Sequence, residues 1–148
     1  MNDIVYAQRL FEMLPIWYED EYQWDGKSIT ISDVKEALRC GVDAERTPYG
    51  DTYKHPPKMQ TKEYHIKRVL WFVQHPEEIK DIEIDNLCHD GWILPSCVVV
   101  DGNHRLMATK VLGINRIPII YCGRLDILDY LGTTDLILHK SRRCGIIG

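Results

Sequence analysis

The sequence lacks several features that would each assign a chain to a class of protein. No apolar run approaches the roughly 20 residues of a membrane-spanning helix, and the first residues lack the basic and apolar regions of a signal peptide. The five cysteines form no close pair, which favours reduced thiols over a disulfide framework. Neither C-x-x-C nor H-E-x-x-H occurs, which argues against a zinc site. We therefore expect a cytoplasmic protein with no membrane partner.

Positive charge is also scarce, since 18 Lys and Arg residues accompany 22 Asp and Glu residues and give a net charge of -4. A protein that coats nucleic acid is usually basic, so this balance excludes a general DNA coat but leaves a local basic site open. The deficit is uneven. Residues 1–58 contain 7 basic and 11 acidic residues, whereas residues 59–148 contain 11 of each. We therefore predict an acidic, mostly helical N-terminal extension over 1–58, packed on a core over 59–148 that ends in a basic tail.

The 148 residues suffice for one ordinary domain with a sizeable core, because 45% are hydrophobic and 27% are charged. In the first part, apolar residues at helical spacing predict a helix over 3–14. Ser32, followed by Glu36, predicts the cap of a short helix that ends near residue 39. Residues 42–60 contain much Pro and Gly without periodicity, which predicts a long loop.

In the second part, helical and extended patterns alternate. Alternation of apolar and acidic residues predicts a half-buried strand over 79–85, with Glu83 and Asp85 on its polar face. A continuous run of β-branched residues predicts a second strand, over 96–100, buried on both faces. The other elements that the pattern predicts are a buried helix over 61–74, a helix over 103–112, a strand over 117–121, a helix over 125–131 and an undefined tail over 137–148.

Chemically useful side chains gather between the second strand and its helix, in the run Asp101-Gly-Asn-His-Arg105. Gly102 can adopt a positive φ, and Asn103 is a good helix cap. The first turn of a helix offers unpaired N–H groups and the positive end of the dipole, which attract anions. Arg105 suits bidentate binding of a phosphate, and His104 suits hydrogen bonding or proton transfer. The alternative is structural: Asn103 caps, His104 lies on the surface, and Arg105 pairs with Asp101.

The run from Cys97 to Gly113, CVVVDGNHRLMATKVLG, followed by Ile-Pro-Ile-Ile, resembles the core of the ParB/sulfiredoxin-like superfamily. The likeness covers residues 79–131: a strand, a Gly-x-His-Arg turn, a helix and an Ile-Pro-type strand. It implies an α+β fold, with a small ParB/sulfiredoxin-like sheet and flanking helices. It also implies that Gly102, Asn103, His104 and Arg105 bind a nucleotide (ATP, ADP or CTP) through its phosphates.

Departures from the family pattern narrow the expected activity. Sulfiredoxins have a catalytic Cys where this chain has Asn103, so sulfinic acid reduction is not expected, and Cys97 is expected to pack within its strand. After residue 131 we expect no helix-turn-helix domain of the ParB type. The Asp-Gly-x-His-Arg turn is most similar to that of the serine-kinase branch and of small phage and plasmid proteins.

Phosphoryl transfer needs a clamp on the phosphates, usually Mg²⁺, and a group that orients or deprotonates the nucleophile. The catalytic candidates are His104, Glu83 and Asp85, and Asp101 is either a metal ligand or a partner of Arg105. The structural alternative for Glu83 and Asp85 is a solvated strand face. No pattern connects the remaining histidines.

Two functions therefore stay open. The first is an enzyme, a phosphotransferase or phosphohydrolase such as an ATPase, a nuclease or a small-molecule kinase. The second is a non-catalytic regulatory module of phage or plasmid type, in which the same turn holds a nucleotide, DNA or an acidic partner.

Overall fold

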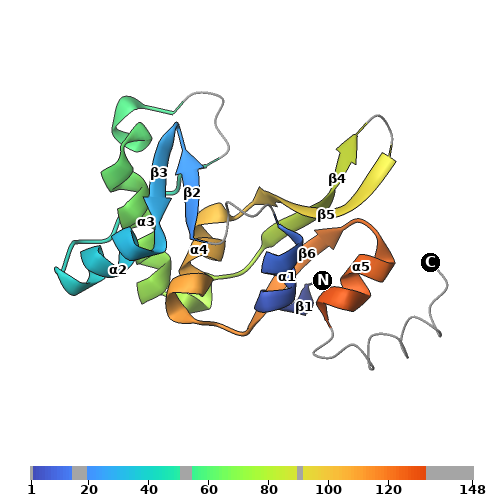
Figure 1. Cartoon of the computed structure of the whole chain (residues 1–148). Helices are drawn as coiled ribbons and strands as arrows, with labels where there is room; N and C mark the ends of the chain where they lie inside the picture. The colour runs from blue at the N-terminus through green and yellow to red at the C-terminus, as the bar shows by residue number, and fades with distance from the viewer. Residues whose placement is uncertain (1, 15–19, 51–54, 90–91, 133–148) are drawn as a thin grey trace. The chain divides into compact units, whose positions relative to one another are not determined.

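The computed structural model describes four stretches of the chain: residues 2–14, 20–50, 55–89 and 92–132. These residues form an α+β fold with a mixed sheet of four strands and a separate sheet of two strands (Figure 1). No helix in these stretches is long and apolar enough to cross a membrane.

The chain divides into two compact units that interleave along the sequence. The sheet unit comprises Met1–Ile16, Lys80–Asn103 and Ile114–Gly148, and the hairpin unit comprises Trp17–Ile79 and His104–Gly113. The division that the charge distribution predicts, between residues 58 and 59, is not one of these boundaries. The first 58 residues contribute to both units, and they contain three strands besides two helices.

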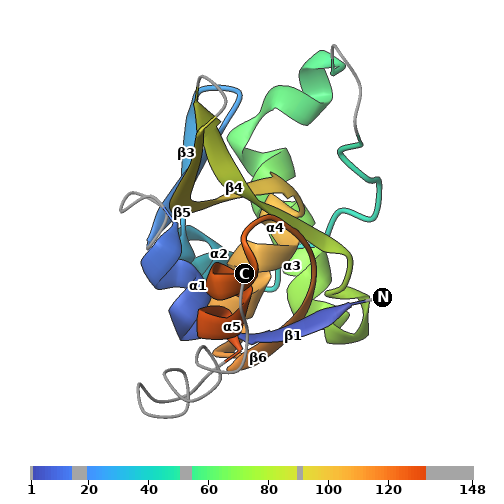
Figure 2. The ribbon, with the colours of Figure 1, turned by 90° about the vertical axis from the view of Figure 1, so that its right-hand side faces the viewer.

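The sheet unit is built on four strands in the order β1-β6-β4-β5. β6 runs parallel to β4, whereas β1 and β5 run antiparallel to their neighbours. Figure 2 views this unit from the side of the β4–β5 hairpin and α5. Ile82, Ile84, Ile117 and Ile119 on the two central strands are fully buried, which is the apolar core of the sheet. The elements of this unit are β1 Asp3–Tyr6, α1 Ala7–Met13, β4 Ile82–His89, β5 Trp92–Asp101, β6 Arg116–Cys122 and α5 Leu125–Leu131.

The hairpin unit begins with two short antiparallel strands joined by the two-residue turn Asp25-Gly26. Both turn residues have positive φ, 51° and 75°, as a type I′ hairpin turn requires. The elements of this unit are β2 Glu21–Trp24, β3 Lys27–Thr30, α2 Ile31–Arg39, the 3₁₀ helices η2 Pro57–Gln60 and η3 Pro76–Glu78, α3 Lys62–Gln74 and α4 Asn103–Leu112.

Most elements expected in the second part of the chain are confirmed. Helices α3, α4 and α5 coincide with the predicted ones within a residue, and β4 has the predicted alternation of buried isoleucines and water-facing acids. α3 is buried around most of its circumference, as expected, and it contacts α2 and β3. The predicted tail and its basic residues lie outside the described residues.

Three predictions are corrected. The helix over 3–14 begins only at Ala7, because residues 3–6 form a strand whose register on β6 outweighs local helical spacing. β5 is not buried on both faces: it is the last strand in the order of the sheet, and Val100 is 60% exposed. The α2 cap is Thr30 rather than Ser32, because Thr30 and Asp33 form a reciprocal capping box.

Candidate functional site

The predicted turn lies where β5 ends at Asp101 and α4 begins at Asn103. Between them, Gly102 has a φ of +105°, which side chains of L-residues rarely adopt. A Cβ atom on Gly102 would also lie 3.2 Å from Cα of Ile82. The positive φ that the sequence predicted is confirmed. The close approach of β4, which the sequence did not predict, also favours glycine at this position.

The three predicted carboxylates lie on the two adjoining strands of the sheet unit. Glu83 stands opposite Asp101 in the register of β4 and β5, and both side chains are exposed. Asp85 is half-buried, and one of its carboxylate oxygens accepts a 2.7 Å hydrogen bond from the backbone N–H of Asn86. Across the described part of the chain, no group of three or more His, Cys, Asp or Glu side chains is arranged to hold a metal ion.

His104, the first residue of the hairpin unit after the turn, is buried with 8% of its surface exposed. The alternative that His104 is a surface histidine is therefore wrong. Its Nε2 atom lies 3.0 Å from Nδ1 of His65, which is completely buried on α3. The side chain of Arg105 is half-buried beside it.

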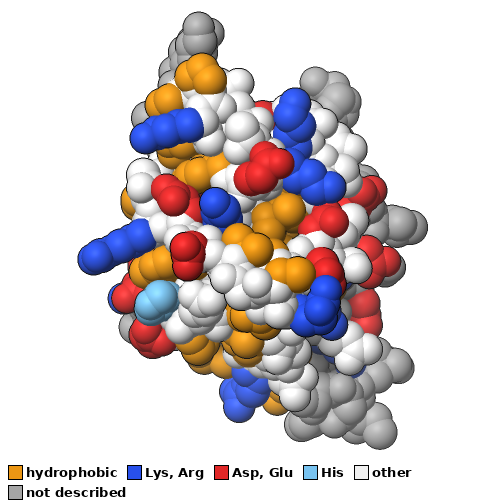
Figure 3. Space-filling view, turned by 90° about the vertical axis from the view of Figure 1, so that its left-hand side faces the viewer, with side chains coloured by type: hydrophobic (Ala, Val, Ile, Leu, Met, Phe, Trp, Pro, Cys, Tyr) orange, Lys and Arg blue, Asp and Glu red, His pale blue; other side chains and the backbone are white. Residues whose placement is uncertain are grey.

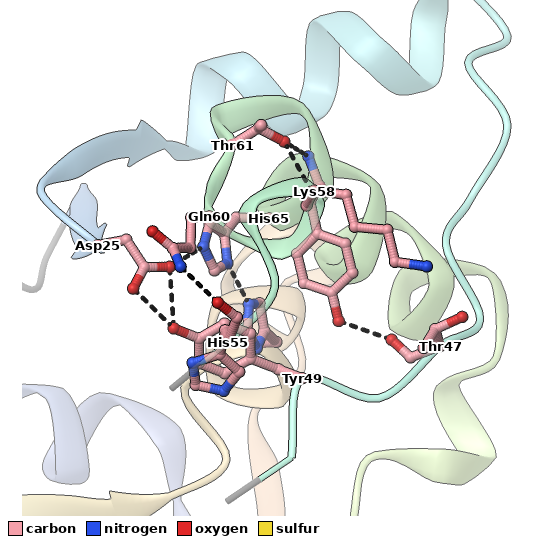
Figure 4. A network of polar contacts seen from close by, with 10 residues as sticks. Asp25, Thr47, Tyr49, His55, Lys58, Gln60, Thr61 and His65 are labelled. Atoms are coloured by element: carbon pink, nitrogen blue, oxygen red, sulfur yellow. Dashed lines mark hydrogen bonds and ion pairs between the residues drawn. The ribbon is translucent and has the colours of Figure 1, made fainter. Parts of the chain in front are cut away.

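The contact continues from His65 to the hairpin turn. His65 Nε2 lies 3.0 Å from Oδ2 of Asp25, and the Tyr49 hydroxyl donates to the same carboxylate at 2.9 and 3.0 Å. Figure 4 shows Asp25 in contact with both Tyr49 and His65. We call Asp25, His65 and His104 the relay, because their hydrogen bonds form one continuous chain from a carboxylate to the N-terminal turn of α4.

The aromatic rings of Trp24 and Tyr49 contact both histidines of the relay. The Trp24 ring stacks on His104 with centroids 4.4 Å apart and planes 12° apart, and on His65 at 5.2 Å. Tyr49 presents its ring at a steep angle to both imidazoles. The two imidazoles are nearly parallel, with planes 10° apart. Because each imidazole contacts both aromatic rings and is hydrogen-bonded to the other, it has little freedom to rotate.

Burial controls the ionisation of the relay. It lowers the pKa of His104 well below the ordinary value of 6.5, and His65, Arg68 and Arg105 lower it further. The pKa of His65 is lowered by burial and raised in part by Asp25. The pKa of Tyr49 is raised by burial and by the adjacent Asp25 carboxylate. At neutral pH the two imidazoles and the Tyr49 hydroxyl are therefore uncharged.

A third histidine extends this polar region. The His55 ring stacks on Tyr49 with centroids 3.6 Å apart, and its buried Nε2 atom has no hydrogen-bond partner among the described residues. The backbone carbonyl of His55 accepts from the Gln60 side chain, which fixes the loop before α3 (Figure 4).

Sequence reasoning identified His104 but missed its partners. Asp25 and His65 lie 40 residues apart in the chain, so no short motif connects them. Two signals were available. Asp-Gly is the strongest short hairpin signal, and it would have placed Asp25 on a tight turn. His65 lies within a helix that is apolar on most sides, so burial would have required a hydrogen-bond partner for it.

No protein-family model, curated protein or solved structure matches the chain. The likeness to the ParB/sulfiredoxin-like superfamily therefore rests on the residues of the turn and its neighbours alone.

Proposed function

We propose that this protein binds a nucleotide (ATP, ADP or CTP) at the N-terminal turn of α4 and, with Mg²⁺, transfers or hydrolyses its terminal phosphate. The observation that carries the proposal is the relay. His104 is uncharged at neutral pH and is hydrogen-bonded through His65 to the Asp25 carboxylate, so it can accept a proton and has a group that orients it, as a general base requires.

The turn supplies what a phosphate needs. The N–H groups of the first turn of α4 carry the positive end of the dipole of a ten-residue helix. Arg105 adds a guanidinium, which suits bidentate binding of phosphate oxygens. These are the residues that the resemblance assigns to phosphate binding.

Mg²⁺ is bound in many phosphoryl-transfer sites by one or two carboxylates together with the phosphates of the substrate. Asp101 directly precedes the turn, and Glu83 stands opposite it on β4. Both side chains offer the oxygen ligands that Mg²⁺ prefers, so the residues present fit the ion. Mg²⁺ would neutralise charge on the phosphates, and Asp101 would hold it.

The direct test is nucleotide-induced thermal stabilisation together with phosphate release, measured for the wild type and for Arg105→Ala. Loss of a charged hydrogen bond should weaken nucleotide binding by about 10- to 100-fold. Lys110→Ala is the matched control, because it removes one positive charge from the other end of α4. Absence of stabilisation and turnover with ATP, ADP and CTP in the wild type would overturn the proposal.

One observation favours a second function, a non-catalytic regulatory module. His104 is covered by Trp24 and only 8% exposed, which restricts access of a substrate to the imidazole. On the face that Figure 3 presents, basic and acidic side chains are interspersed, which suits a small phosphorylated ligand or a protein partner better than DNA. Nucleotide binding without turnover in the wild type would support this function, and a steep salt dependence of DNA binding would identify DNA as the partner.

A further inference from the structure

We propose that Asp25 and His65 are positioning residues that hold His104 as its Nε2–H tautomer, so that His104 Nδ1 accepts the proton of a hydroxyl nucleophile, either water or an alcohol. This inference rests on the proposed function and deepens it. It assigns the acceptor class, a neutral O–H group, and it gives roles to two residues that lie outside the turn.

The direction of each hydrogen bond follows from the carboxylate. An ionised carboxylate only accepts, so His65 must donate from Nε2 to Asp25. A neutral imidazole carries one N–H, which leaves Nδ1 of His65 as an acceptor. His104 must then donate from Nε2 across the 3.0 Å contact. The remaining lone pair of the His104 ring is on Nδ1, and it can only accept.

The surroundings of Asp25 keep this direction fixed. Tyr49 donates its hydroxyl proton to both oxygens of the carboxylate, so the carboxylate receives hydrogen bonds from two sides. Asp25 also occupies the first position of a two-residue hairpin turn with φ of 51°, which gives its side chain a defined position relative to β2 and β3. The relay therefore starts from a carboxylate that contacts both Tyr49 and His65.

In the reaction, the nucleophile oxygen forms a bond to the terminal phosphorus while the bond between that phosphorus and the bridging oxygen breaks. The shortened nucleotide leaves with the electron pair of that bond. The proton of the nucleophile passes to His104 Nδ1, and the imidazolium so formed donates through His65 toward Asp25. The proton then returns to solvent, which restores the starting tautomer.

Charged groups around His104 determine its pH dependence. His65 and Arg68 on α3 and Arg105 on α4 all disfavour the imidazolium, while Asp25 on the hairpin turn favours it through His65. His55, from the loop before α3, lowers the pKa of His65. The acid limb of the activity profile should therefore lie below pH 6.5, the ordinary pKa of histidine.

The first test reads the tautomers directly, by ¹⁵N–¹H NMR of the histidine rings in the full wild-type chain at pH 7.5. The expected spectrum shows protonated Nε2 and unprotonated Nδ1 for both His65 and His104. Protonated Nδ1 on either ring overturns the proposal, whatever the activity of the protein. In Asp25→Asn, the amide can donate to His65, so the two rings should show a mixture of tautomers. Asp43→Asn, an exposed and nearly isosteric change, should leave both spectra unchanged.

The second test measures turnover of the nucleotide that the wild type uses. Asp25→Asn should lower kcat on the order of 10²–10⁴-fold with little change in KM, and should move the acid limb to lower pH, because the imidazolium loses its carboxylate. Asp25→Glu should recover part of kcat, whereas Asp25→Ala should not. An unchanged kcat and acid limb in a folded Asp25→Asn protein overturns the positioning roles. A wild type without turnover overturns the proposed function and the proton-transfer role with it, and the NMR spectra then decide the tautomers separately.

Discussion

The two units bury polar side chains in different ways. In the sheet unit, Asn86 is 4% exposed, and its side-chain oxygen accepts from the Tyr121 hydroxyl and from the backbone N–H of Arg124, each at 2.7 Å. Its amide nitrogen donates to the Ser96 carbonyl. This group contains no side chain that changes charge near neutral pH, because burial raises the pKa of Tyr121 above its ordinary value. Its hydrogen bonds are therefore the same at every physiological pH.

In the hairpin unit, two buried histidines, His65 and His104, are hydrogen-bonded to each other, and His65 is hydrogen-bonded to the exposed Asp25. Their hydrogen bonds depend on which ring nitrogen holds a proton, so this group of side chains responds to pH near neutrality, whereas the Asn86 group does not. The difference teaches that buried polarity alone does not indicate function. What distinguishes the relay is that its histidines can gain or lose a proton near neutral pH, which no side chain of the Asn86 group does.

The largest effect on stability is expected from Asn86→Ala. The change removes the acceptor of the half-buried Arg124 N–H and one of the two acceptors of the Tyr121 hydroxyl, which also donates to the Arg124 carbonyl. It should lower the free energy of unfolding by about 2–3 kcal/mol. Chemical denaturation at pH 7.5 and pH 5.5 measures it, and the loss should be equal at both. Asn115→Ala, at an exposed position, should change stability by less than about 0.5 kcal/mol. A loss that varies with pH would contradict the neutral character of this group.

Gly123→Ala disturbs the same group of side chains, because an added Cβ would lie 2.2 Å from Oδ1 of Asn86. It should lower the free energy of unfolding of the protein by about 1–3 kcal/mol. Denaturant midpoints of the single variant and of the double variant with Asn86→Ala measure the coupling. In the double variant the contact with Asn86 is gone and only the 2.9 Å approach of the Cβ to the Tyr121 hydroxyl remains. The double variant should therefore lose less stability than the sum of the two single losses. Additive losses would show that the backbone at Gly123 moves freely.

The next prediction concerns the pH dependence of stability that the buried histidines of the hairpin unit should cause. The pKa of His104 is lowered in the folded state. As the pH falls below 6.5, His104 therefore becomes protonated in the unfolded chain while it stays neutral in the folded chain. Stability should therefore fall from pH 7.5 to pH 5.5, by on the order of 1 kcal/mol for each such histidine. Urea denaturation between pH 7.5 and 5.5 measures this fall in the free energy of unfolding, and the fall should be smaller in His104→Gln than in the wild type.

Val34→Ala serves as the control for that measurement. Val34 is fully buried on α2, so the change lowers stability without removing a titratable group, and the fall with pH should persist. Stability of the wild type that is constant between pH 7.5 and 5.5 would contradict the buried, uncharged state of the two imidazoles.

The smallest effects are expected when one tyrosine hydroxyl is removed from each unit. Tyr49→Phe and Tyr121→Phe each remove one hydrogen bond and should each lower stability by about 1 kcal/mol. Only Tyr49→Phe should raise the pKa of His65, because the Asp25 carboxylate then loses a competing donor. NMR titration of the His65 ring measures this. An equal shift in both variants would remove the distinction between the two groups.

The sequence predicted the local features of the turn well, because the residues involved are neighbours. The positive φ of Gly102 and the start of α4 follow from backbone propensities within five residues. The alternation of Ile82 and Ile84 with Glu83 likewise reports the two faces of β4 directly.

Two kinds of feature were beyond such reasoning. The strand over residues 3–6 exists because β6, more than a hundred residues later, offers it a hydrogen-bonding edge, so local periodicity misassigned it. The burial of His104 depends on Trp24 and His65, which reach it from β2 and α3. Pairings of this kind are decided by tertiary packing, and no window of the sequence contains both partners.

The interleaving of the two units has a consequence for synthesis on the ribosome. β1 is synthesised long before β6, and it cannot form its strand pairing until β6 has been made, since Asp3 pairs with Ile119. Asp25 and His65 meet His104 only after a further 39 residues have been made beyond His65. The hairpin unit is complete in the nascent chain at residue 113, before the strand that closes the sheet has been translated. The growing chain can thus complete the relay while the sheet still lacks the strand that joins its first edge to the rest.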